Sequence, residues 1–244
     1  MTAEPLIRCR GVTKSFRSKA VLRGVTLDVL PGETLVLLGG SGSGKSVLLK
    51  HLNGLIRPDA GSIEVEGVQL ETLDEDGLVP IRRRVSMLFQ QGALFDSLPV
   101  GENVAFPLRE HHMLPDDEIP ARVGEALAMV GLEGTERVMP SELSGGMRKR
   151  AALARALVLE PRVVLYDEPT TGLDPVVAAK INDLIRELQQ RLGLTSVVVT
   201  HDLKSAFYVA DRIAFLFEGR IAFTGTPGDA RGTSHAALHE FLTA

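Results

Sequence analysis

The sequence predicts an α/β fold with a mostly parallel core sheet, an N-terminal antiparallel β layer and a helical insert. Short apolar runs that read as buried strands alternate with helix-compatible segments, as in parallel sheets covered by helices. Strand candidates separated by tight turns fill the N-terminal third, and apolar residues recur at helical spacing in the middle. We expect one domain over residues 1–244, with the core and β layer at about 1–90 and 161–244 and a helical subdomain at about 91–160.

Two groups of strands are expected. The candidates for the buried parallel sheet are Thr34–Leu38, Val163–Tyr166, Ser196–Thr200 and Ile213–Phe217. The candidates for the antiparallel layer are Val21–Leu27 and Ser62–Glu66, with turns at Pro31-Gly32 and Glu66-Gly67. The first group is apolar throughout, which is typical of strands buried on both faces.

Helices are expected between and after these strands. One follows Lys45 and ends near Gly54, and another follows Asp117, where Ile119, Val123, Leu127 and Val130 share one helical face. A third begins at Ser144 and runs toward Leu159, because Pro161 stops it. The C-terminal segment, 233–244, has apolar residues at helical spacing, and we expect it to pack on its own domain.

Composition excludes several classes of protein. The chain is 44% hydrophobic, so it can bury a substantial core. A net charge of −4 gives no general basic field, and nucleic acid is therefore not an expected partner. The single cysteine, Cys9, fits a reducing compartment, and we expect no signal peptide and no membrane span. A function at a membrane would therefore require another subunit.

A glycine-rich segment between a predicted strand and a predicted helix matches the phosphate-binding pattern G-x-x-x-x-G-K-S. Its residues are Gly39, Gly40, Ser41, Gly42, Ser43, Gly44, Lys45 and Ser46. Glycines let backbone N–H groups turn inward around a β-phosphate. We expect Lys45 to hold the β- and γ-phosphates of ATP, Ser46 to ligate Mg²⁺, and Val47 to complete the nucleotide site.

Two acidic residues end another predicted buried strand. Asp167 is expected to hold the water shell of Mg²⁺, and Glu168 is expected to act as general base toward water attacking the γ-phosphate. Many strands end in solvated carboxylates, so the assignment of Asp167 and Glu168 depends on the phosphate loop upstream.

A second phosphate-binding surface is expected at Ser144, Gly145 and Gly146, within Leu143–Met147 at a helix start. Two such surfaces in one chain indicate a nucleotide clamped from two sides. His201 follows a predicted strand beside Asp202, which favours a γ-phosphate sensor over an ordinary surface histidine. The remaining histidines expected to face solvent are His111, His112, His235 and His239.

The order of these motifs resembles the nucleotide-binding subunit of an ABC transporter over nearly the full chain. The resemblance implies that Gln90, in Phe89-Gln90-Gln91, reaches Mg²⁺ and senses a membrane partner, and that Gly172–Asp174 is the D-loop. It also implies that Phe16 stacks on adenine, although an aromatic residue on such a strand is more often part of the core.

The same resemblance implies a homodimer of ATPase chains in which ATP is shared head to tail. Ser144, Gly145 and Gly146 of one copy would contact the γ-phosphate held by Lys45 of the other. The dimer would act at the cytoplasmic face of the inner membrane, bound to an integral membrane permease.

One departure from the common signature sequence narrows the resemblance to a subfamily of these ATPases. Met147 replaces the usual glutamine, and Arg148–Arg150 follow, which we expect to form a solvated helix face or to supply positive potential near the nucleotide. With Phe89–Phe95 and Asn103–Glu110, this pattern is similar to the ATPases of phospholipid trafficking, whose complexes include an MCE-domain lipid-binding protein. The apolar stretch Ala93–Leu108 would then form the groove for the permease, or else pack within the insert.

Four other functions share part of the pattern. A small-molecule kinase needs neither the signature nor the histidine. ABC-type DNA-repair or chromosome ATPases carry coiled coils or zinc modules, and ABC translation factors join two cassettes in one chain. The main alternative is the ATPase of an importer for amino acids or another small solute.

Overall fold

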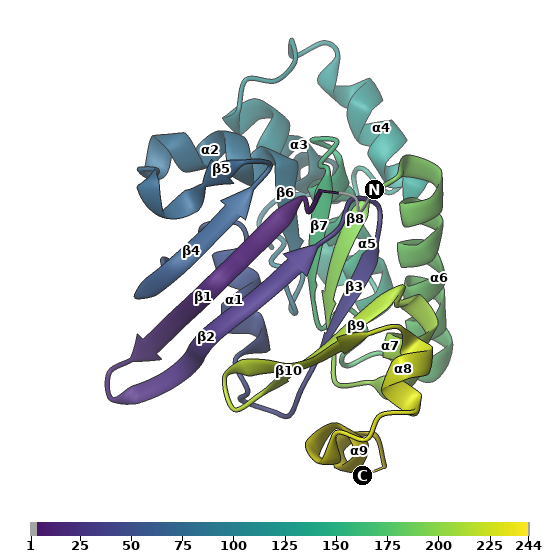
Figure 1. Ribbon diagram of the computed structural model, residues 1–244. Helices are drawn as coiled ribbons and strands as arrows, with labels where there is room; N and C mark the ends of the chain where they lie inside the picture. The colour runs from purple at the N-terminus through teal and green to yellow at the C-terminus, as the bar shows by residue number, and fades with distance from the viewer. Residues whose placement is uncertain (1–3, 244) are drawn as a thin grey trace.

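The computed structural model describes residues 4–243 and contains two β-sheets (Figure 1). The six strands of the larger sheet are, in spatial order, β10 (Arg220–Gly225), β9 (Arg212–Phe217), β3 (Thr34–Leu38), β8 (Thr195–Val199), β7 (Val163–Asp167) and β6 (Val85–Leu88). All neighbours pair in parallel except β10, which is antiparallel to β9. The smaller sheet is antiparallel and has the order β2 (Lys19–Val29), β1 (Ile7–Phe16), β4 (Ala60–Val65) and β5 (Val68–Gln69). The predicted fold class is confirmed.

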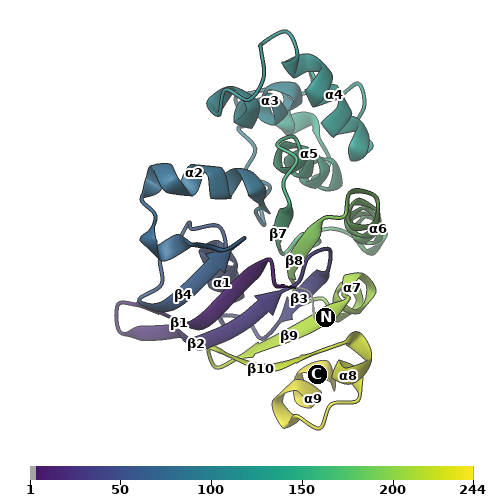
Figure 2. The same ribbon diagram turned by 45° about the horizontal axis from the view of Figure 1, so that its top comes forward.

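Helices connect and cover these sheets. They are α1 (Lys45–His51), α2 (Glu75–Arg84), α3 (Val100–Glu110), α4 (Ile119–Met129), α5 (Gly145–Leu157), α6 (Pro175–Leu192), α7 (Leu203–Val209), α8 (Pro227–Arg231) and α9 (Ala236–Thr243), with 3₁₀ turns η1 (Leu70–Thr72) and η2 (Pro140–Glu142). Figure 2 shows α3, α4 and α5 grouped together, away from the antiparallel sheet. None of the helices within residues 4–243 has both the length and the apolar character that crossing a bilayer requires.

The larger sheet separates two apolar cores. Side chains alternate across a strand, so Val36 and Leu38 of β3 enter the core under the helices, whereas Leu35 and Leu37 enter the core shared with the antiparallel layer. All five residues of β3, β7 and β8 are buried, which explains their uninterrupted apolar sequence. This burial fixes the strands, and with them the loops that follow their carboxyl ends.

Local signals set the ends of α6. Asp174 caps its first turn by accepting hydrogen bonds from the N–H groups of Val176 and Val177, both at 3.0 Å. Pro175 occupies the first turn, where its missing N–H costs nothing, and Gly193 ends the helix in the left-handed region at φ 63°. The helix buries Ile181, Leu184, Ile185 and Leu188 on one face.

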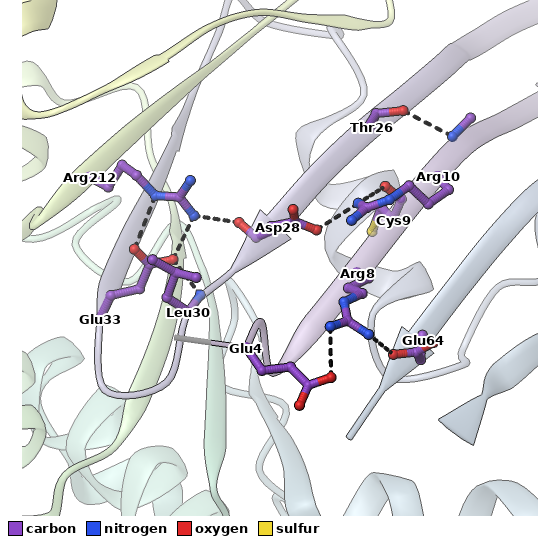
Figure 3. A network of polar contacts seen from close by, with 11 residues as sticks. Glu4, Arg8, Cys9, Arg10, Thr26, Asp28, Leu30, Glu33, Glu64 and Arg212 are labelled. Atoms are coloured by element: carbon purple, nitrogen blue, oxygen red, sulfur yellow. Dashed lines mark hydrogen bonds and ion pairs between the residues drawn. The ribbon is translucent and has the colours of Figure 1, made fainter. Parts of the chain in front are cut away.

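A polar network joins the two sheets (Figure 3). Arg212, at the start of β9, makes hydrogen bonds to both carboxylate oxygens of Glu33, at 2.7 and 3.0 Å, and also donates to the Asp28 carbonyl of β2. Within the antiparallel sheet, Arg10 pairs with Asp28 at 2.6 Å and Arg8 with Glu64 at 2.8 Å. The bidentate Arg212–Glu33 pair is the type of ion pair with the most definite geometry, and the further contact of Arg212 with the Asp28 carbonyl links it to the β layer.

The C-terminal helix packs on its own chain. Leu238 of α9 is fully buried, and the Phe241 ring lies 5.3 Å from the ring of Phe215 in β9. His235 also lies against Phe215 and is half-buried, as is His111. The prediction that both side chains face solvent is therefore wrong for His111 and His235, and the Phe215 ring covers part of His235.

Candidate functional site

The candidate site lies at the carboxyl ends of three adjacent parallel strands, β3, β8 and β7. Leu37 pairs with Val199, and Asp167 pairs with Val199 from the other side. The loops after these strands carry the glycine-rich segment, His201, and the Asp167–Glu168 pair. The topology thereby brings residues as far apart in sequence as Gly39 and His201 to one edge, where ligands bind in open α/β sheets.

The glycine-rich loop requires glycine for steric reasons. A Cβ on Gly39 would lie 2.5 Å from the backbone oxygen of Leu216, closer than any side chain allows. Gly42 and Gly44 have φ values of 72° and 105°, in the region where other residues are strained. Within residues 4–243, the buried hydroxyl oxygen of Ser43 has no hydrogen-bond partner. A polar atom of this kind, enclosed by a glycine loop, suits a site that takes a hydrogen-bonding ligand such as a phosphate.

Lys45 places its ammonium group inside this loop. Its Nζ donates to the carbonyl oxygens of Gly39 at 2.8 Å and Gly40 at 3.0 Å. Burial lowers the pKa of the Lys45 ammonium, and the nearby carboxylates of Glu168 and Asp167 oppose that shift. A buried ammonium beside turned backbone is suited to binding a phosphate anion.

Ser46 and Asp167 meet directly. The Ser46 hydroxyl donates to Asp167 Oδ1 at 2.7 Å, across 121 positions in the sequence. Asp167 is 6% exposed, at the end of a fully buried strand. The two residues thus present oxygen ligands beside the phosphate loop, and such oxygens suit Mg²⁺.

Glu168 lies at the centre of a short hydrogen-bond chain. Its carboxylate lies 3.0 Å from His201 Nδ1 and accepts from the Thr171 hydroxyl at 2.9 Å. Its backbone adopts φ 51°, a conformation that costs a residue with a side chain roughly 1–3 kcal/mol unless its surroundings hold it. The His201 side chain is exposed whereas the Glu168 side chain is only 12% exposed, so the carboxylate is the more buried partner of the pair.

Lys149 is a site residue whose burial and contacts the sequence did not reveal. With Arg148 and Arg150 it was expected on a solvated face or as positive potential near the nucleotide. It is only 7% exposed, and its Nζ donates to the backbone carbonyls of Gln90 and Glu168. Burial lowers the pKa of the Lys149 ammonium, and Asp167 and Glu168 oppose that shift. Its spacing on α5, three residues after buried Gly146 and four before buried Leu153, was a signal for an inward position.

Gln90 itself is exposed, in the loop that follows β6. Within the described residues its side chain makes no hydrogen bond with Ser46 or Asp167, the other two predicted metal ligands. Its contact with the site runs through its backbone carbonyl and Lys149.

The signature residues lie at the start of α5. The Ser144 hydroxyl accepts from the N–H of Met147 at 3.3 Å and so caps the helix. Side chains added at Gly145 and Gly146 would meet Leu173 of the predicted D-loop and Val177 of α6. No hydrogen bond joins these three residues to the phosphate loop of the same chain, as far as residues 4–243 extend.

Phe16 is 45% exposed at the end of β1, with Lys14 Nζ 5.8 Å from its ring centroid. The structure therefore excludes the alternative that this ring belongs to the core, and leaves it accessible for stacking.

Val47 is half-buried on the first turn of α1, where its side chain packs against the core.

A glycine-rich loop after β3, an acidic pair at the end of β7 and a histidine after β8 form an arrangement typical of nucleotide-hydrolysing proteins of the phosphate-loop class. The family model described as ABC transporter matches residues 22–171, more than half of the chain. The chain belongs to this family and is an ATPase that hydrolyses ATP to drive transport.

Two solved structures share the fold. The ATP-binding cassette MJ0796, solved as a dimer bound to ADP and Pi, is 34% identical, with a TM-score of 0.83 over 91% of this chain and 98% of that one. The protein cbiO1 of Clostridium perfringens, part of the ABC transporter complex cbiONQ, is 30% identical, with a TM-score of 0.86 over 98% and 95%.

Some of the curated relatives are named for ribonucleotides and others for lipids. The probable ribonucleotide transport ATP-binding protein mkl of Mycobacterium leprae is 47% identical over 97% of this chain and 68% of its own length. Protein trigalactosyldiacylglycerol 3 of Arabidopsis thaliana is 40% identical over 99% and 74%. The intermembrane phospholipid transport system ATP-binding protein MlaF of Escherichia coli is 39% identical over 97% and 88%. The chain covers 66% of the length of the mkl protein of Mycobacterium tuberculosis.

Proposed function

We propose that this chain powers a phospholipid-trafficking transporter in the cell envelope, from the cytoplasmic face of the inner membrane. The observation that carries the proposal is the likeness to MlaF, at 39% identity over 97% of this chain and 88% of that protein. The relative named for trigalactosyldiacylglycerol, a galactolipid, supports the broader class of lipid substrates. The proposed partners are a second ATPase chain, an integral membrane permease and an MCE-domain lipid-binding protein.

The proposed permease surface comprises the loop between Gln90 and α3, which carries Phe95, and the exposed side of α3 at Phe106. Phe95 and Phe106 are 41% and 40% exposed, and their ring centroids lie 4.8 Å apart. Other apolar residues of the stretch 93–108, including Val100, Val104 and Leu108, are buried, so only part of it is available to a partner. A pair of exposed aromatic rings is typical of a protein-contact surface.

The loop that carries Phe95 is held by side chains from two helices. The side chain of Asn103, fully buried in α3, accepts from the Phe95 N–H at 2.7 Å and donates to the Leu98 carbonyl at 2.8 Å. Arg155 of α5 donates to the carbonyls of Gly92 and Ala93 at 2.8 and 2.7 Å. A force on the loop would therefore reach α5, which begins with the signature.

For hydrolysis, we propose that Lys45 and the loop backbone bind the β- and γ-phosphates of ATP. Ser46 and Asp167 would hold Mg²⁺, with Gln90 as a third ligand in the loaded state. The described residues contain no cluster of three or more acidic, histidine or cysteine ligands. A site with few protein ligands fits Mg²⁺, because this ion binds through one or two side chains together with substrate phosphates and water. When bound, the ion neutralises charge on the β- and γ-phosphates.

Glu168 is the proposed general base, and His201 the proposed γ-phosphate sensor. The Glu168 carboxylate is the group that can accept a proton from water, and the contacts with His201 and Thr171 fix its direction. Ser144, Gly145 and Gly146 would complete the site of the partner chain, because within one chain they make no hydrogen bond with the phosphate loop of residues 4–243. Phe16 would stack on adenine.

A second candidate function is the transport of ribonucleotides or another small solute. The 47% identity to mkl favours it, but the chain spans only about two thirds of those mycobacterial relatives. The motifs common to both classes, from the phosphate loop to His201, do not discriminate between them.

Isolation of the native complex from membranes distinguishes the two candidates. The phospholipid proposal expects an MCE-domain subunit and bound phospholipid, and ATPase activity of the reconstituted complex that responds to lipid composition. A solute-binding protein as partner, with turnover stimulated by ribonucleotides or amino acids, would overturn it.

A further inference from the structure

The buried ammonium of Lys149 lies where three parts of the molecule meet. Lys149 belongs to α5, which carries the signature at its start, whereas its two acceptors follow β6 and β7. One acceptor is the carbonyl of Gln90 and the other is the carbonyl of Glu168, at 3.3 Å in the latter case. The side chain therefore connects the signature helix to both loops that approach the hydrolysis site.

The contact at Glu168 falls on a strained peptide. Glu168 adopts φ 51°, and its N–H donates to the Val199 carbonyl of β8 at 2.9 Å. With its N–H held by β8 and its C=O held by Lys149, the backbone of this residue is fixed on both sides. The side chain can then reach His201 Nδ1 and the Thr171 hydroxyl together.

A lysine is buried here at a cost that apolar packing would avoid. An ammonium group loses its water on burial, so a structural role alone is better served by an apolar side chain of the same length. Charge-assisted donation to two carbonyls offsets this cost only while both loops stay in place. The contact thus depends on the relative position of α5, the Gln90 loop and the end of β7.

We infer that Lys149 is a positioning residue, which holds the Glu168 backbone in its turned conformation and couples it to the Gln90 loop and the signature helix. This inference rests on the proposed role of Glu168 as general base. A partner that displaces the Gln90 loop would thereby change the position of the Glu168 carboxylate through the Lys149 ammonium group.

The test measures ATP hydrolysis and ATP binding by the full chain with Lys149→Met, which keeps the length of the side chain and removes its donors. A shift of about 1 Å in a reacting group can lower a rate about 100-fold, and we expect a loss of kcat of this order. ATP affinity should stay at the parental value, because Lys45 and its loop are untouched. Lys149→Arg, which restores charged donors, should recover part of the lost rate. Lys180→Met removes an exposed lysine from α6 and is the matched control.

A double-mutant cycle with Glu168→Gln separates positioning from a general structural effect. If Lys149 acts through Glu168, adding Lys149→Met to Glu168→Gln lowers the residual single-turnover rate no further. Additive losses, or a parental rate for Lys149→Met, would overturn the inference. If Lys149→Met does not fold, Lys149→Gln, which keeps an amide donor on a shorter stem, takes its place in the cycle. Parental turnover of Glu168→Gln alone would instead reject the proposed general base.

Discussion

The Glu168 carboxylate is largely buried and has two hydrogen-bond partners. An isosteric substitution can therefore test its role in proton transfer while its packing is retained. Glu168→Gln keeps the shape of the side chain and an oxygen that can accept from Thr171, but it removes the ability to take a proton from water. We expect kcat to fall by about 10²–10⁴-fold, the usual contribution of a general base. Turnover is measured with phosphate release.

ATP binding by the same variant should be unchanged, because Lys45 and Ser46 are retained. Binding is measured by calorimetry, with Lys45→Ala as the variant that should lose affinity through the missing ammonium. A turnover number equal to that of the parent chain would contradict the assignment of the base.

Cys9 offers a second prediction at the scale of a single residue. It is 1% exposed in β1, and burial raises the pKa of its thiol to about 12. Because the thiolate is the reactive form, Cys9 should resist alkylation in the folded chain at about pH 8 and react readily in urea. The unfolded thiol ionises at lower pH than the folded one, so this group lowers the stability of the fold as the pH rises through the unfolded pKa. Rapid labelling of the native chain would contradict the burial.

At the scale of elements, the start of α6 is a site where one side chain has a definite stabilising role. Asp174 satisfies two of the unpaired N–H groups of the first turn. Asp174→Ala should lower the free energy of unfolding by about 1 kcal/mol, whereas Asp174→Asn, also a good cap, should cost much less. Urea denaturation of the isolated chain measures both. Equal stability of the alanine and asparagine variants would show that the cap contributes nothing.

The most buried strands were the elements most readily predicted from sequence. β3, β7, β8 and β9 are apolar enough to be recognised, whereas β6, β10 and the long helix α6 were not predicted. Of two further helices, α3 was seen only as an apolar stretch and α2 was not predicted. Each of these helices contains an internal proline, Pro107 or Pro80, a residue that ordinarily ends a helix. Tertiary packing overrides that local signal, since Leu108 of α3 and Leu78 of α2 are buried in separate cores.

For the candidate site, the sequence specified the backbone loops and the residues at strand ends, because chemistry fixes their spacing. It did not specify Lys149, whose role depends on how α5 packs beside β6 and β7. A basic run reads as a solvated surface unless the buried face of the helix is known. The side-chain contacts of Gln90 and the roles of the signature residues stay predictions, as does the division of the chain into core and helical subdomain.

At the scale of the whole molecule, the separation of the signature from the phosphate loop has a consequence for assembly. In the described chain Ser144 caps α5, and Lys45 lies inside the loop after β3, with no hydrogen bond between the two. MJ0796, which is 34% identical, has been solved as a dimer with ADP and Pi. A two-fold dimer can place the signature of one copy against the phosphate loop of the other, and each dimer then holds two composite sites.

A mixed dimer tests this arrangement. Lys45→Ala removes the phosphate ligand, and Ser144→Arg blocks the signature, so either variant alone spoils both sites of its homodimer. A heterodimer of the two variants collects both defects in one site and leaves the other site intact. In a random one-to-one mixture roughly a quarter of all sites should then occlude ATP, whereas each variant alone occludes almost none. Occlusion is measured by trapping labelled ATP in the turnover-deficient Glu168→Gln background. If each chain encloses its nucleotide unaided, mixing restores nothing, because every chain still carries its own defect.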